Sequence, residues 1–144
     1  METINLYELK KLQTSFPKQK ITSSKTAADF IRQFYSDDIE IFESVFILLL
    51  SNSNQTIGYA KISQGGITGT VIDVRLIAKY AVESLAVGII IAHNHPSGVL
   101  KPSQPDLDIT KKTKNALSFF DIKVLDHLIL TSDEYYSMAD NDLI

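Results

Sequence analysis

Blocks of apolar and polar positions along the chain predict alternating strands and helices. Two continuous apolar runs, at 45–50 and 87–92, have the length and composition of strands that are buried on both faces. A polar stretch at 51–55 separates the first run from a second strand pattern at 56–63, which predicts a hairpin. Residues 122–130 predict a further strand, and residues 135–138 predict a short last one.

Helices are predicted where apolar residues recur every three or four positions. Leu6, Leu9 and Leu12 predict a short opening helix that ends before Pro17, and Ser24 is the predicted cap of a second helix. The expected apolar faces of the remaining helices are Ala27, Ala28, Phe30, Ile31 and Phe34; then Val74, Ile77, Ala78, Ala81 and Leu85; and finally Ile109, Thr113, Ala116 and Phe120. Strands mixed with helices around a central buried strand predict one layered domain of the α/β or α+β class.

Composition narrows the chemistry that this domain could perform. The chain of 144 residues has no cysteine, which excludes disulfides, thiolate metal sites and cysteine nucleophiles. Its 14 basic and 17 acidic residues give a net charge of −3 and no long basic run, so nucleic-acid binding is not favoured. Without a leader or a membrane-spanning run, we expect a cytoplasmic protein with no membrane partner.

Two of the three histidines, His93 and His95, lie at the end of the buried run 87–92. Residues two apart on an extended chain point to the same side, and Pro96 favours an extended conformation for the residue before it. The two imidazoles could therefore form half of a metal site, with Asn94 facing the other way. The alternative is that both are loop histidines bonded to nearby carbonyls.

Asp106 is the candidate third ligand, because it opens the helix that follows and belongs to its inward-facing stripe. The alternative is a capping box, in which Ser103 and Asp106 satisfy backbone donors at the start of the helix. Two histidines and one carboxylate match a catalytic zinc site that keeps a fourth position for water. Such a site also needs a proton carrier. Glu43 and Glu40 both precede the strand at 45–50, and spacing does not choose between them or exclude that both are solvated.

Together, His93, His95, Pro96, Ser103 and Asp106 form the pattern H-x-H-P-x6-S-x2-D. This pattern resembles the signature of the JAMM (JAB/MPN) metalloprotease superfamily, and the stretches AHNHPSG, VLDHLILT and YYSMAD are similar to its bacterial RadC-type branch, whose members are called DNA repair proteins. The resemblance implies a mixed, curved sheet flanked by helices. It implies Zn²⁺ held by His93, His95 and Asp106, with Glu43 as general acid/base and Ser103 as donor to the oxyanion.

From this resemblance we expect a zinc-dependent hydrolase of peptide or isopeptide bonds, acting on a peptide or protein substrate. The alternative is a non-catalytic binding or regulatory module associated with DNA repair. Residues 26–144 are the expected RadC-like domain, and residues 1–25 the expected N-terminal helical extension, with no helix-hairpin-helix region. His127 matches an Asp-His pair of the RadC branch; we favour a structural role for it over orientation of a ligand.

Overall fold

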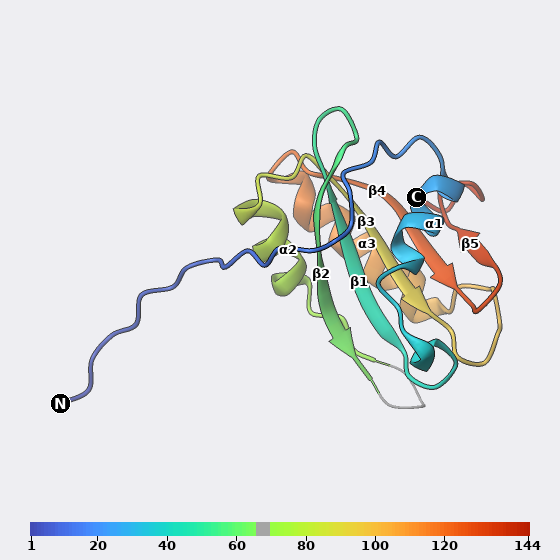
Figure 1. The fold of residues 1–144 in the computed structure, drawn as a ribbon, viewed down its shortest axis with the longest axis horizontal. Helices are drawn as coiled ribbons and strands as arrows, with labels where there is room; N and C mark the ends of the chain where they lie inside the picture. The colour runs from blue at the N-terminus through green and yellow to red at the C-terminus, as the bar shows by residue number, and fades with distance from the viewer. Residues whose placement is uncertain (66–69) are drawn as a thin grey trace.

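A computed structural model describes residues 1–65 and 70–144. Its elements alternate along the chain much as the patterns predict (Figure 1). They are helix α1 (Ser24–Arg32), the short 3₁₀ helix η1 (Asp37–Glu40), strands β1 (Ser44–Leu50) and β2 (Thr56–Gln64), helix α2 (Val74–Glu83), strand β3 (Gly88–Asn94), helix α3 (Gln104–Ser118), and strands β4 (Lys123–Leu130) and β5 (Tyr135–Ser137).

The strands form one five-stranded mixed sheet in the order β2-β1-β3-β4-β5. The strands β3 and β4 are parallel, and all other neighbouring pairs are antiparallel. The parallel pair is joined through α3, as a parallel connection requires a crossover. The predicted fold class, a mixed sheet flanked by helices in one α+β domain, is confirmed.

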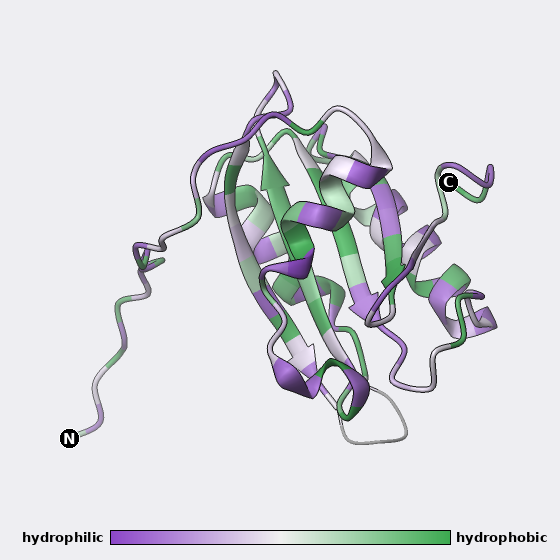
Figure 2. Ribbon diagram, turned by 45° about the vertical axis from the view of Figure 1, so that its right-hand side comes forward, coloured by the Kyte–Doolittle hydropathy of each residue, from purple (hydrophilic) through white to green (hydrophobic). Residues whose placement is uncertain are grey.

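Both faces of the sheet are covered, which explains the continuous apolar runs. Every residue of β1 and of β3 is buried. Side chains such as Ile47 and Ile91 pack under α2 and α3 on one face, whereas Leu48 and Ile90 pack under α1 on the other. Figure 2 shows apolar residues concentrated in the central strands and polar residues on the outer surfaces of the helices.

The sheet brings the candidate residues together at one end. Antiparallel pairing places Val45, near the start of β1, opposite His93, near the end of β3. Parallel pairing places His127 of β4 beside Ile91, two residues before His93 and therefore on the same face. The first turn of α3 lies over this end of the sheet. Segments from four parts of the chain thus meet where β3 ends.

The predicted helix around Leu6, Leu9 and Leu12 is wrong. Residues 1–19 contain no helix, and Leu6 and Leu12 are more than four-fifths exposed. A helix this short is unstable in water unless its whole apolar stripe packs on a surface, and of the three leucines only Leu9 is partly buried. The chain joins the domain before α1, where Phe16 packs against the core and Lys20 bridges to Gln55. The expected boundary between residues 25 and 26 lies inside α1, which begins at Ser24.

Two details of the other helices also differ from the sequence prediction. The N-cap of α1 is Ser23, whose hydroxyl oxygen accepts from Thr26 N, and not Ser24. In α3 the buried residues are Thr110, Thr113 and Leu117, whereas Phe120 is exposed. The expected apolar face of this helix, which includes Ile109, Ala116 and Phe120, is displaced from the buried one, because Phe120 lies after the helix has ended. Among the described residues, no helix has both the length and the apolarity to cross a membrane.

Candidate metal centre

His93 and His95 direct the same ring nitrogen, Nε2, to one point at the end of β3. The two Nε2 atoms lie 2.9 Å apart. His93 is the penultimate residue of the strand and is buried, whereas His95 lies just beyond the strand and is half-buried. The Nδ1 of His95 lies 2.7 Å from the carbonyl oxygen of Val99, which can only accept. The proton of neutral His95 is therefore on Nδ1, and its Nε2 lone pair is free to bind a metal.

Asp106 caps its helix and also faces both histidines. Its Oδ1 lies 3.4 Å from His93 Nε2, and its Oδ2 lies 3.3 Å from His95 Nε2. The same Oδ2 accepts from Ser103 N, and Ser103 Oγ accepts from Asp106 N, which completes the capping box. Capping thus holds the carboxylate rigidly toward the imidazoles. Although burial raises the pKa of Asp106, the neighbouring imidazoles of His93 and His95 outweigh that effect and hold the pKa well below its ordinary value.

Glu43, and not Glu40, reaches this point. Its Oε1 lies 3.8 Å from His93 Nε2, and a ligand atom of Glu43 lies within 4.8 Å of one on each of the two histidines. Glu40 is exposed at the end of η1. Burial raises the pKa of Glu43, and the neighbouring His93 and His95 oppose that shift. A raised pKa makes the Glu43 carboxylate a stronger base than an ordinary exposed glutamate, as a proton carrier requires.

The donor set fits a zinc ion. Bonds of about 2.0–2.2 Å at tetrahedral angles separate neighbouring ligand atoms by ~3.3–3.6 Å. The two distances from Asp106 to the imidazoles match this spacing, and the distance between the imidazoles is somewhat shorter. Glu43 stands farther from His93 than Asp106 does. His93, His95 and Asp106 could therefore hold the metal, with Glu43 beyond the ligand shell.

Two residues that sequence reasoning did not assign to the site lie behind His93. The Nδ1 of His93 lies 2.7 Å from Nε2 of His127, whose own Nδ1 lies 2.6 Å from Oγ1 of Thr110. His127 and Thr110 are both buried, and burial lowers the pKa of His127 well below its ordinary value, so its imidazole is neutral. The Asp-His pair was the only sequence signal for His127, and nothing in the sequence indicated Thr110.

Asn94, between the two histidines, faces the opposite side of β3, as the alternation predicts. Its side chain accepts from Ser44 N and donates to the carbonyls of Ile39 and Phe42. These three partners flank Glu43 in the sequence, so the hydrogen bonds of Asn94 fix the segment that carries Glu43. The tripeptide at 93–95 therefore serves both sides of the site, with histidines toward the metal position and an amide that holds the glutamate in place.

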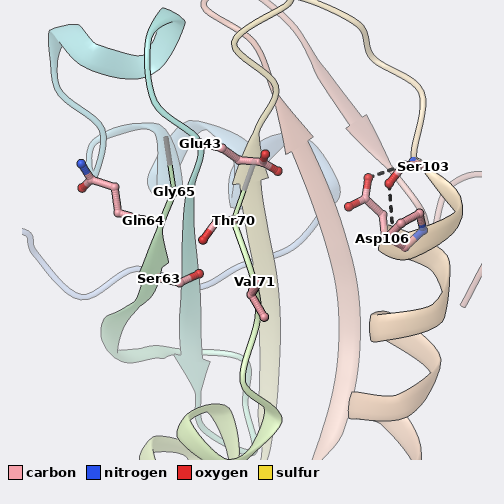
Figure 3. Close-up of a pocket in the computed structure, with 9 residues that line it drawn as sticks. Glu43, Ser63, Gln64, Gly65, Thr70, Val71, Ser103 and Asp106 are labelled. Carbon is pink, nitrogen blue, oxygen red and sulfur yellow. Dashed lines mark hydrogen bonds between the residues drawn. The ribbon is translucent and has the colours of Figure 1, made fainter. Parts of the chain in front are cut away.

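The site opens into a surface cleft. Figure 3 shows the carboxylates of Glu43 and Asp106 directed toward one another, with Ser103 beside Asp106. Pro105 also lines the cleft. The remaining lining residues lie on its far side: Ser63, Gln64, Gly65, Thr70 and Val71. Ser103 is exposed, and because its oxygen accepts from Asp106 N, its own proton is available to a molecule in the cleft.

The sequence is similar to a known family and to several curated proteins. A family model described as "RadC-like JAB domain" matches residues 21–143. A "UPF0758 protein" of Flavobacterium johnsoniae is 47% identical over 125 residues, which cover 87% of this chain and 54% of the relative. Proteins of the same name are 39% identical in Porphyromonas gingivalis, over 88% of this chain and 56% of the relative, and 34% identical in Chlorobium chlorochromatii, over 100% and 65%.

The chain thus spans about half the length of the first of these relatives. The family match covers nearly all of the chain, including every candidate residue from Glu43 to His127. From the matched region, the mixed sheet and the histidine pair at the end of β3, we conclude that the chain belongs to the family of RadC-like JAB domains.

Proposed function

We propose that this domain is a zinc-dependent hydrolase of peptide or isopeptide bonds. The observation that carries the proposal is that His93, His95, Asp106 and Glu43 converge on one point beside an open cleft, although they come from three separate parts of the chain. A bound zinc ion would supply Lewis acidity, which polarises the scissile carbonyl and lowers the pKa of water.

The protein's own residues would divide the remaining work. Glu43 would accept a proton from the attacking water as the oxygen of that water bonds to the carbonyl carbon. It would then deliver that proton to the amide nitrogen as the carbon–nitrogen bond breaks, leaving a carboxylic acid and an amine. The raised pKa of Glu43 supports both transfers. Ser103 would donate its hydroxyl proton to the oxygen that becomes negatively charged.

The test compares two glutamates that are three residues apart. Glu43→Gln removes the proton carrier, and Glu40→Gln is the matched control on an exposed side chain. Zinc content is measured by mass spectrometry, and cleavage is measured with a peptide library and an isopeptide-linked substrate in the presence of zinc. We expect Glu43→Gln to retain zinc and to lose about 10²–10⁴-fold in rate. Glu40→Gln should behave as the wild type.

Two results would contradict the proposal. Cleavage by Glu43→Gln at the wild-type rate would remove the assigned role of this residue. A wild-type protein that binds zinc and cleaves none of these substrates would instead be a binding or regulatory module.

A further inference from the structure

A metal-binding histidine must present a lone pair, and its other nitrogen decides whether it does. Neutral imidazole carries one proton, on Nδ1 or on Nε2. A partner that accepts at Nδ1 holds the proton there and leaves Nε2 free for the metal. For His95 that partner is the carbonyl of Val99, which has no proton to give. For His93 the partner is His127, which could either donate or accept.

The direction of the bond between His93 and His127 is fixed one step further away, at Thr110. The hydroxyl of Thr110 lies 2.6 Å from the carbonyl oxygen of Asp106 and 2.6 Å from Nδ1 of His127. A hydroxyl has one proton, and a carbonyl can only accept. Because the proton of Thr110 goes to Asp106, its oxygen must accept from His127. The proton of His127 is then on Nδ1.

The position of the proton on His127 determines which nitrogen of His93 is free to bind a metal. With its proton on Nδ1, His127 has an unprotonated Nε2, so it accepts from Nδ1 of His93. His93 therefore keeps its Nε2 lone pair, and this is the atom that lies 2.9 Å from His95 Nε2 and 3.4 Å from the Asp106 carboxylate. The reverse direction would protonate His93 at Nε2 and block the ligand atom.

We propose that Thr110 and His127 are positioning residues that hold His93 in the tautomer able to bind zinc. Asp106 then acts twice, because its side chain faces the metal position while its main-chain carbonyl starts the chain of hydrogen bonds behind His93. The inference rests on the metal-binding half of the proposed function and does not depend on hydrolysis.

The experiment has a readout that needs no substrate. Nitrogen NMR of ¹⁵N-histidine-labelled full-length protein, with and without zinc, reports which ring nitrogen of each histidine carries a proton. We expect His93 and His127 both to be protonated on Nδ1 in the wild type. A wild-type His127 that is protonated on Nε2 would overturn the proposal, and this measurement requires no variant to fold.

Three substitutions in α3 separate positioning from packing. Thr110→Val keeps the shape and removes the hydroxyl, and Thr110→Ser restores the hydroxyl. Thr113→Val is the matched control, because Thr113 is also buried and donates its hydroxyl proton to the carbonyl four residues earlier, but it is not hydrogen-bonded to a histidine among the described residues. Zinc affinity is measured by competition with a chelator. We expect Thr110→Val to weaken zinc binding by about 10–100-fold and to alter the His127 nitrogen signals.

Thr110→Ser and Thr113→Val should keep both the zinc affinity and the histidine signals of the wild type. Zinc binding by Thr110→Val at wild-type strength would overturn the proposal, and so would an equal loss in Thr113→Val. The outcomes remain distinct from those of the proposed function. A protein with these tautomers and this zinc affinity but no amidase activity would remove the hydrolase proposal alone.

Discussion

His93 and His95 present the same atom to the same point, but the protein supports them in different ways. His95 is held by Val99, four residues later in the same loop. His93 is held by His127, which is 34 residues away on another strand and is itself held by α3. The exposed fraction of the side chain is 15% for His95 and 1% for His93. One ligand therefore depends on a local turn and the other on the packed core.

Removing each ligand in turn gives the largest expected effects and tests this difference. His93→Ala and His95→Ala should each weaken zinc binding by more than ~100-fold, beyond the loss typical of outer partners. They should differ in stability. His93→Ala opens a cavity and leaves Nε2 of His127 buried without its partner, which costs roughly 2–4 kcal/mol of unfolding free energy. His95→Ala, in a loop, should cost less than about 1 kcal/mol.

Urea unfolding of the metal-free variants measures both costs, and zinc competition confirms the loss of the ligand. Equal destabilisation by the two substitutions would contradict the distinction between a core-supported and a loop-supported ligand.

The same distinction explains what the sequence could predict. The strands were located because the runs at 45–50 and 87–92 are buried on both faces, and the side on which His93, Asn94 and His95 point follows from the two-residue period of a strand. The capping of α3 by Ser103 and Asp106 is local too, and the structure contains it. Patterns within about ten residues carried this information.

Contacts between distant segments could not be predicted in this way. Thr110 and Asn94 are small polar residues whose partners lie 17 and about 50 positions away. The partners of these two residues can be identified only when the order and register of the strands are known. The helix predicted from Leu6 and Leu12 failed for the same reason, because spacing alone cannot say whether a surface exists for a stripe to pack on.

A smaller effect is expected from the loop that supports His95. Gly98 has a φ of +84°, and its N–H donates to the carbonyl of His95, which forms the turn that brings Val99 into place. An L-residue in this conformation costs about 1 kcal/mol. Gly98→Ala should therefore weaken zinc binding by up to about five-fold.

Gly58→Ala is the matched control. Gly58 lies in β2, an added Cβ there meets no atom within 4 Å, and its φ is outside the left-handed region. Zinc competition should show wild-type affinity for Gly58→Ala. An unchanged affinity for Gly98→Ala would mean that the turn does not position His95.

The smallest expected effect concerns Asp126, which precedes His127 on β4. Burial raises the pKa of Asp126, although hydrogen bonds from Ser137, Ala139 N and His127 N oppose the shift. A raised folded-state pKa contributes stability that is complete below the unfolded value, 3.8, and is lost as pH rises through the folded value. The unfolding free energy of the metal-free wild type, minus that of Asp126→Asn, should therefore fall across that pH range and then level off. Urea unfolding at a series of pH values measures this difference, and a difference that rises with pH would show that the hydrogen bonds on β4 outweigh the burial of the carboxylate.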